Sequence, residues 1–461
     1  MICEQTRDEP PKPLPSLKGP KRVVLVRHGQ STWNAEGRVQ GSCDLSVLTD
    51  KGKAQAHTTK ELLLNERFDA LYKSPLARAV ETAEIIWGDR SGQVKELPYL
   101  REIDLYSFQG LLKHEGKERF GDQYKNWQKQ AFLFELDNHA PIRELWYRAS
   151  VGWQDILSCK GSTILVVAHN AVNQALICTA LGMPPEFFRR LLQSNGATTV
   201  LDFQPDSRNS ATPPVIVDRL NQSPGPPFGK EPAGGARVVL VRCGETEGSE
   251  QGRLTGVHDY PLSPLGDVHG NKAGEFLMDL RVSKVLASPL QRAQHTANLI
   301  TTYQQLAGSR KPDIQTLDSL NNRDWGEWEG RFTSELSGQP IDPSVEGLDA
   351  FYARVGEAWA AVRETCFSGD SDSEGGHSVV TVTHGSVIAC ILCHCLGLGQ
   401  EALPLWRADA GGITVIDFPD LSEPDRVVVR CSNFTAHLGR WSVPITPDEE
   451  LAGVCGIDGC F

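Results

Sequence analysis

The sequence predicts an α/β fold built twice in tandem, each copy a mostly parallel sheet with helices on both faces. Two long segments repeat each other, short Val- and Leu-rich runs alternate with helical patterns, and a Pro- and Gly-rich stretch separates the copies. The chain has 461 residues, more than a single hydrophobic core usually serves. Each of these observations predicts part of the architecture.

The repeat consists of three motifs that recur in the same order. The pairs are RVVLVRHGQSTWN (22–34) with RVVLVRCGETEGS (237–249), SPLARAVETAEII (74–86) with SPLQRAQHTANLI (288–300), and LVVAHNAVN (165–173) with VTVTHGSVI (380–388). The offset is 215 residues between Arg27 and Arg242 and 214 between Arg78 and Arg292. A period of this length indicates a duplicated domain.

Composition predicts where the domains begin and end. Residues 221–235, NQSPGPPFGKEPAGG, are dense in Pro and Gly and lack a hydrophobic period, which is typical of a linker. We therefore expect a first domain over residues 21–220 and a second over 236–461. Residues 1–20, whose first part is rich in Pro and Glu, are expected to form a disordered N-terminal arm.

Strands and helices alternate within each copy. In the first copy we expect buried strands at 23–26 and 164–168 and helices at 77–87 and 171–181. This alternation predicts a mostly parallel sheet. Ligands of such sheets bind at the carboxyl ends of the strands, where Arg27, His28 and His169 fall.

Charge and cysteine content exclude several functions. The net charge of -12 argues against a nucleic-acid or anionic-membrane binder, and no run of 18 apolar residues predicts a membrane span. The 12 cysteines are scattered without a signal peptide, so we expect reduced thiols. The cluster Cys390–Cys395 is expected to be buried thiols on a helix. No metal and no cofactor are predicted.

The segment LVRHGQSTWN (25–34) resembles the signature of the histidine phosphatase superfamily, which includes the cofactor-dependent phosphoglycerate mutases. The resemblance implies a phosphoglycerate mutase-like fold and a phosphohistidine on His28. The segment 101–104 resembles the family's acid motif, which implies that Glu102 is the general acid. The resemblance also implies that Asn34, the last residue of segment 25–34, binds the phosphate group.

The chemistry follows from the residue types. Arg27 and Arg78 would neutralise a phosphate dianion through bidentate hydrogen bonds, so that neutral His28 can attack phosphorus. His169 would stabilise the charge that develops on the equatorial oxygens. Gly29 would let the backbone approach the phosphoryl oxygens. We therefore expect metal-independent phosphoryl transfer.

The first domain also resembles one plant and algal branch, the 2-carboxy-D-arabinitol-1-phosphatases. The resembling segments are 26–41, 48–52, 101–117, 143–146 and 168–175. The resemblance to this branch implies a small-molecule substrate, a sugar-acid phosphate that inhibits Rubisco. It also implies a location in the chloroplast stroma; apart from this resemblance, we expect a cytoplasmic location. The oligomeric state is not predicted.

A substrate with a carboxylate calls for a second cationic site. Segment 109–113 resembles the QGLxK element of phosphoglycerate mutases, so Lys113 is the first candidate, with Lys117 and Lys129 weaker. Mutases also carry an Arg pair after a Trp, and the matching stretch here is WQKQ at 127–130. Its absence favours a phosphatase. A mutase and another sugar-phosphate phosphatase remain alternatives.

The second copy has diverged at the reactive positions. Cys243 replaces His28, Asn322 replaces Glu102, and Ser249 replaces Asn34. Cys243 lacks the C-x5-R context of cysteine phosphatases. The second domain is therefore either a scaffold, which we favour, or a non-hydrolytic binder of a phosphorylated effector.

A non-enzyme function is the remaining alternative. The whole chain could be a sugar-phosphate sensor or a Rubisco-binding protein. The intact set of reactive residues in the first copy argues against this, because a sensor needs no general acid.

Overall fold

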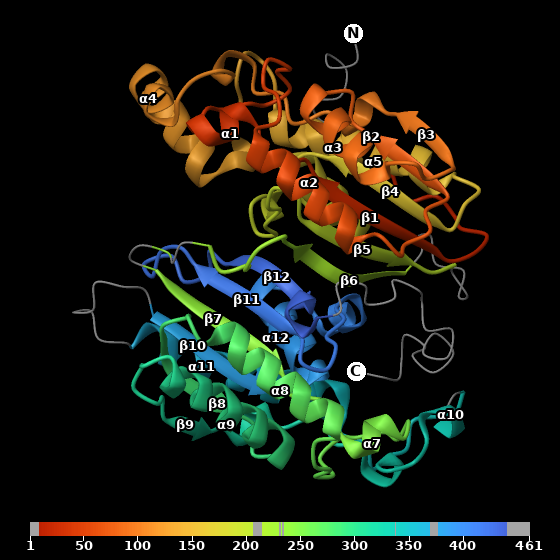
Figure 1. The fold of residues 1–461 in the computed structure, drawn as a ribbon, viewed down its shortest axis with the longest axis vertical. Coiled ribbons are helices and arrows are strands. Elements are labelled where there is room, and N and C mark those ends of the chain that lie inside the picture. The colour runs from red at the N-terminus through yellow and green to blue at the C-terminus, as the bar shows by residue number, and fades with distance from the viewer. Residues whose placement is uncertain are drawn as a thin grey trace. The chain divides into compact units, whose positions relative to one another are not determined.

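The computed structural model describes residues 9–205, 214–229, 232, 235–336, 338–368 and 377–439. The chain divides into two compact units, Met1–Pro226 and Pro227–Phe461. In Figure 1 the first unit runs from red to yellow-green and the second from green to blue.

The strands of the first unit follow the order β3-β2-β4-β1-β5-β6. They are β1 (Lys21–Arg27), β2 (Ala70–Lys73), β3 (Gln93–Glu96), β4 (Thr163–Ala168), β5 (Thr198–Phe203) and β6 (Val215–Gln222). The pairs β3–β2, β2–β4 and β4–β1 are parallel, whereas β1–β5 and β5–β6 are antiparallel. β1 lies between β4 and β5, so residues 23–26 are fully buried.

Helices cover this sheet. They are α1 (Thr32–Glu36), α2 (Asp50–Leu62), α3 (Ala77–Trp87), α4 (Lys113–Lys129), α5 (Pro141–Leu157) and α6 (Asn170–Ala180). α2 packs against α3, and α5 packs against α6. α3 has the predicted bounds, and α6 begins one residue before the predicted start.

Residues 9–20 differ from the disordered arm that the composition predicts. The Lys12 backbone N–H donates to Ser150 Oγ at 2.8 Å, and Gln154 Nε2 donates to the Pro13 carbonyl at 2.8 Å. Leu14 is buried. A Pro-rich segment has little conformational entropy to lose, so one buried Leu and two hydrogen bonds to α5 hold it. Residues 1–8 lie outside the described residues.

The second unit repeats the strand order, as β12-β11-β7-β10-β8-β9. Its strands are β7 (Ala236–Arg242), β8 (Val282–Ala287), β9 (Ile314–Thr316), β10 (His377–Thr383), β11 (Ile413–Phe418) and β12 (Val428–Phe434). Its helices are α7 (Glu247–Glu250), α8 (Pro264–Leu277), α9 (Gln291–Leu306), α10 (Thr333–Leu336), α11 (Leu348–Phe367) and α12 (Gly385–Leu396). Where the first unit has the 17-residue α4, the second has the four-residue α10.

A buried ion pair recurs in both units. Arg22 Nε donates to Asp202 Oδ1 at 2.6 Å, and Arg237 Nε donates to Asp417 Oδ1 at 2.7 Å. In each unit the two residues lie opposite each other on adjacent antiparallel strands. Arg22 and Arg237 stand at matching positions of the repeat, near the starts of β1 and β7. Each ion pair therefore joins its strand to the antiparallel neighbour.

Candidate active site

Three parallel strands of the first unit deliver polar side chains to one edge of the sheet. β1, β2 and β4 end just before His28, Ser74 and His169. The His28 backbone N–H donates to the Ala168 carbonyl at 3.0 Å, and the Ser74 N–H donates to the Val167 carbonyl at 3.0 Å. Hydrogen bonding between the strand ends therefore fixes the spacing of these side chains.

His28 is buried, with 2% of its surface exposed. Its Nδ1 lies 2.6 Å from the Gly29 carbonyl oxygen. A carbonyl only accepts, so Nδ1 carries the proton and Nε2 keeps a free lone pair. Burial, Arg78 and Arg27 together hold the His28 pKa well below its ordinary value. The imidazole is therefore neutral and able to act as a nucleophile.

Two guanidinium groups are held rigidly beside it. Arg78 donates to the carbonyls of Cys43 at 2.8 Å and Gly41 at 2.9 Å, and Arg27 donates to the Gln193 carbonyl at 2.7 Å. Burial lowers the pKa of Arg78 and brings that of Arg27 to about 10. Within the described residues, the buried Nε of each has no hydrogen-bond partner. Both groups keep donors for an anion.

His169 lies against His28, with ring centroids 5.0 Å apart. Its Nε2 is 2.7 Å from Ser74 Oγ, and its buried Nδ1 has no partner among the residues described. Burial, Arg78 and His28 lower the His169 pKa well below 6.5. If the Ser74 hydroxyl donates to Nε2, the neutral ring presents an Nδ1–H to an incoming oxygen. Sequence reasoning missed Ser74, although it begins a repeated motif.

Glu102 lies at the N-terminus of α6. Its Oε1 accepts from the backbone N–H groups of Ile103, Ala171 and Val172, each at 3.0 Å. Its negative charge acts on both Arg27 and Arg78, raising their pKa values against the effect of burial. The structure thus brings Glu102 into the same cluster as the cations.

Asn34 lies in the first turn of α1, where it forms a capping box with Ser31. Its Oδ1 also accepts from Asn195 Nδ2 at 3.1 Å, and the same Nδ2 donates to the His28 carbonyl at 3.0 Å. Asn195 therefore ties Asn34 to the backbone of His28. The repeat contains no hint of Asn195, because Ala410 stands at the matching position.

Gly29 has a different close neighbour from the one expected. A Cβ at Gly29 would lie 2.1 Å from the Gly52 carbonyl oxygen, and a Cβ at Gly52 would lie 2.0 Å from the Gln30 carbonyl oxygen. The first turn of α2 therefore packs directly on the backbone after His28. The glycines are required by this backbone-to-backbone contact.

Lys113 is exposed at the first residue of α4, and in the described part of the chain no hydrogen bond or ion pair joins it to the cluster. Lys117 and Lys129 are exposed on the same helix. The structure therefore brings together five of the predicted residues and leaves Lys113 apart from their contacts. The five are Arg27, His28, Arg78, Glu102 and His169.

Arg189 was not predicted. Its guanidinium lies 4.5 Å from the centre of the Trp127 ring and donates to the Trp127 carbonyl at 2.9 Å. Its backbone has a left-handed φ of 72°, and its N–H donates to Gln174 Oε1 on α6. A guanidinium from another part of the chain thus stands beside the stretch that lacks the mutase Arg pair.

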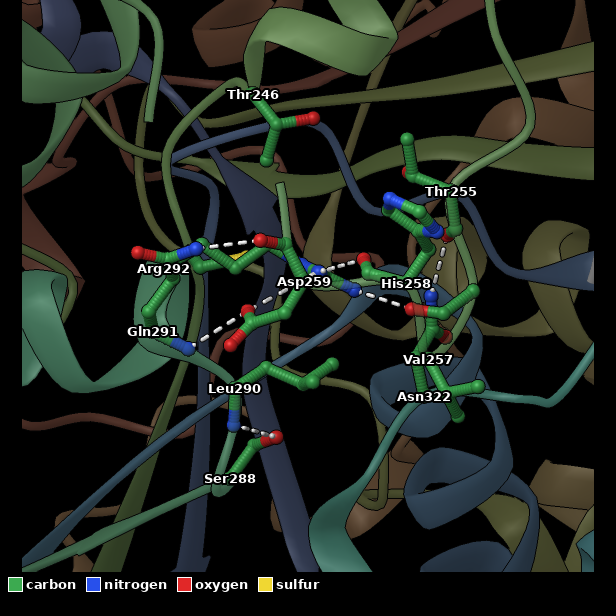
Figure 2. Close-up of polar contacts among 12 residues, drawn as sticks. Thr246, Thr255, Val257, His258, Asp259, Ser288, Leu290, Gln291, Arg292 and Asn322 are labelled. Atoms are coloured by element: carbon green, nitrogen blue, oxygen red, sulfur yellow. Dashed lines mark hydrogen bonds and ion pairs between the residues drawn. The ribbon is translucent and has the colours of Figure 1, made fainter. Parts of the chain in front are cut away.

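The second unit reproduces the arrangement without its reactive groups. His384 Nε2 is 2.8 Å from Ser288 Oγ, and Cys243 Sγ is 3.7 Å from His384 Nδ1. Figure 2 shows Asn322 donating to the Thr255 carbonyl, at 2.8 Å. Burial raises the Cys243 pKa, although Arg292 and Arg242 oppose it.

No group of three or more His, Cys, Asp or Glu residues in the described ranges could hold a metal ion, and no disulfide joins the cysteines of those ranges. Cys390, Cys393 and Cys395 are buried in α12. No helix in those ranges is both long enough and apolar enough to cross a bilayer.

Comparison with known proteins places these features in a family context. The model of the histidine phosphatase superfamily (branch 1) matches residues 23–212 and 238–429. The chain is 45% identical to the 2-carboxy-D-arabinitol-1-phosphatase of Triticum aestivum, covering 97% of this chain and 93% of that protein. It is 43% identical to the probable 2-carboxy-D-arabinitol-1-phosphatase of Arabidopsis thaliana, covering 92% and 90%.

A more distant relative covers less of the chain. The probable phosphoglycerate mutase GpmB of Enterobacter sp. (strain 638) is 32% identical over 40% of this chain and 85% of its own length. The two plant proteins thus share the tandem length, whereas the bacterial protein has the length of about one domain.

Proposed function

The chain belongs to branch 1 of the histidine phosphatase superfamily, and from this premise we propose that its first domain hydrolyses a phosphate monoester through a phosphohistidine on His28. The observation that carries the proposal is the buried imidazole of His28, whose Nδ1 is engaged by the Gly29 carbonyl and whose pKa is held low by burial and by the Arg78 and Arg27 guanidiniums. Such a group is a nucleophile poised for an anion that Arg27 and Arg78 neutralise.

The first step forms the phosphoenzyme. The Nε2 lone pair of His28 forms a bond to phosphorus while the bond from phosphorus to the ester oxygen breaks. Glu102 enters this step as the carboxylic acid, gives its proton to the departing alcohol oxygen and is left as the carboxylate. The Nδ1–H of His169 and the free donors of Arg27 and Arg78 stabilise the equatorial oxygens as charge spreads over them.

The second step releases phosphate. Water attacks phosphorus, the bond from phosphorus to Nε2 breaks, and Glu102 takes the proton from the water. The products are the alcohol, inorganic phosphate and the original enzyme. Besides the ester and water, these two steps use only side chains of the first domain.

The proposed substrate is 2-carboxy-D-arabinitol 1-phosphate or a related sugar-acid phosphate, in the chloroplast stroma. The names of the two plant relatives, at 45% and 43% identity over most of both chains, support this choice. The probable phosphoglycerate mutase GpmB is also a relative, but in this chain the residues after Trp127 are Gln128 and Lys129 and not an Arg pair.

The test is phosphate release by the purified chain from a matched panel. The panel contains 2-carboxy-D-arabinitol 1-phosphate, 3-phosphoglycerate and glucose 6-phosphate. We expect the highest kcat/KM for the first. Conversion of 3-phosphoglycerate to its isomer without phosphate release would indicate a mutase, and no reaction with any ester would indicate a sensor.

A further inference from the structure

The second domain keeps the anion-binding part of the site and loses its reactive part. We define the second cluster as Arg242, Ser288, Arg292 and His384. Its Arg292 is 2% exposed. It donates to the His258 carbonyl at 2.9 Å, a contact between two residues labelled in Figure 2. It also donates to the Gly256 carbonyl. These contacts match those that Arg78 makes to two carbonyls of its own domain.

The loop around Arg292 is itself fixed. Asp259 Oδ1 accepts from the Gln291 backbone N–H at 2.8 Å and lies 4.0 Å from Arg292 Nη1. In the first domain Asp44 accepts from the Ala77 N–H at 2.7 Å in the same way. The orientation of the guanidinium is therefore set before any ligand arrives, which lowers the entropic cost of binding.

The second guanidinium is held similarly. Arg242 donates to the Ala408 carbonyl, as Arg27 donates to the Gln193 carbonyl. Arg292 and Arg242 both lower the pKa of buried His384, after burial itself. Both guanidiniums thus act on the imidazole at the centre of the second cluster, which stays neutral.

The charge balance differs between the domains. In the first, the Glu102 carboxylate acts on both guanidiniums. In the second, neutral Asn322 takes its place and accepts from Ser386 Oγ at 2.5 Å. Glu245, next to Gly244, accepts instead from Ser263 Oγ at 2.9 Å. Buried cations that have lost a neighbouring carboxylate favour an anionic ligand.

The same replacements remove turnover. Burial raises the Cys243 pKa, so the thiol stays neutral and is a poor nucleophile. Asn322 cannot protonate a leaving alcohol or deprotonate water. The second cluster can therefore hold a phosphate ester but has no means of cleaving it.

We propose that the second domain binds the phosphate group of a small phosphate monoester on Arg242, Arg292 and His384 without hydrolysing it. The site is separate from the proposed catalytic site in the first domain, so the two proposals can fail independently. Free inorganic phosphate shares the recognised chemistry, and the experiment distinguishes it from an ester.

The test counts binding sites on the full chain carrying His28→Ala, which prevents hydrolysis. Equilibrium dialysis is done with radiolabelled inorganic phosphate and, separately, with radiolabelled ribose 5-phosphate. We expect about two sites per chain, one lost with Arg78→Gln and the other with Arg292→Gln. Tighter binding of ribose 5-phosphate than of phosphate at the site lost with Arg292→Gln would identify an ester site.

Two further variants keep the test decisive. Arg281→Gln removes a charge from an exposed position of the same domain and should leave the site count unchanged. Asn322→Glu restores the missing carboxylate and should weaken binding at the second site by at least about tenfold, even where Arg292→Gln impairs folding. A single site that Arg78→Gln abolishes, and that Arg292→Gln and Asn322→Glu leave intact, would overturn the proposal.

Discussion

At the scale of single residues, the site depends on which nitrogen of each histidine is already engaged. The Gly29 carbonyl takes Nδ1 of His28, and Ser74 takes Nε2 of His169. The two imidazole rings therefore present different nitrogens to the substrate. His28 offers the Nε2 lone pair as a nucleophile, and His169 offers the Nδ1–H as a hydrogen-bond donor. Sequence motifs place both residues but cannot assign these tautomers.

The role of Glu102 can be tested by the choice of leaving group. Glu102→Gln keeps the shape but cannot transfer a proton, so alkyl phosphates should lose about 10²–10⁴ in kcat, whereas esters of acidic phenols should lose much less. Steady-state kinetics on glucose 6-phosphate and p-nitrophenyl phosphate measure the difference. Equal losses would mean that Glu102 only holds the first turn of α6, to which it is hydrogen-bonded.

Lys113 gives a second prediction at this scale. If its ammonium meets the substrate carboxylate on binding, Lys113→Ala should raise KM for a sugar-acid phosphate by a factor that corresponds to about 1–3 kcal/mol. A neutral sugar phosphate should be unaffected. Lys125→Ala, which removes an exposed lysine of the same helix that is not a candidate for carboxylate binding, is the matched control. A uniform rise for both substrates would remove Lys113 from carboxylate recognition.

At the scale of elements, the reactive loop depends on a close approach between β1 and α2. Gly52→Ala would place a Cβ 2.0 Å from the Gln30 carbonyl, and backbone must move to relieve the clash. We expect a loss of about 1–3 kcal/mol in the free energy of unfolding and a fall in kcat as the His28 loop shifts. Gly19→Ala, whose Cβ meets nothing within 4 Å, is the control. Urea unfolding that shows the same stability for both variants would contradict this reading.

Secondary-structure elements could be predicted from the sequence more completely than the individual residues that contact the site. Local patterns in the sequence predict β1, β4, α3 and α6, because buried Val runs and helical periods are local signals. They do not specify the order of the strands in the sheet. Ser74 could have been found, since its motif recurs at Ser288. Asn195 and Arg189 could not, because their contacts with the His28 carbonyl and with Trp127 span long stretches of sequence and they belong to no repeated motif.

At the scale of the whole molecule, both domains bury neutral histidines, two in the first cluster and one in the second. Burial and nearby guanidiniums lower the pKa values of His28, His169 and His384 well below 6.5. The unfolded chain therefore binds more protons below pH 6.5, and stability falls as pH decreases through that value. Each such histidine contributes a slope approaching about 1.4 kcal/mol per pH unit.

This slope can be measured by urea unfolding between pH 7.5 and 5.5. His384→Asn should reduce the pH dependence of the unfolding free energy by the contribution of one histidine. Carboxylates contribute equally to parent and variant, so they do not affect this difference. An unchanged slope in His384→Asn would show that this imidazole is already charged, or solvated, in the folded protein.

In the proposed reaction a covalent phosphohistidine forms on His28 of the first domain, and none forms in the second domain. The direct measurement is a rapid acid-free quench of the full chain with substrate labelled in its phosphate, followed by peptide mapping. We predict one acid-labile, base-stable label, on His28, with no label on any peptide from residues 236–461 and none in His28→Ala. Label in His28→Ala, or on the second domain of the parent, would contradict the assignment of the chemistry to His28.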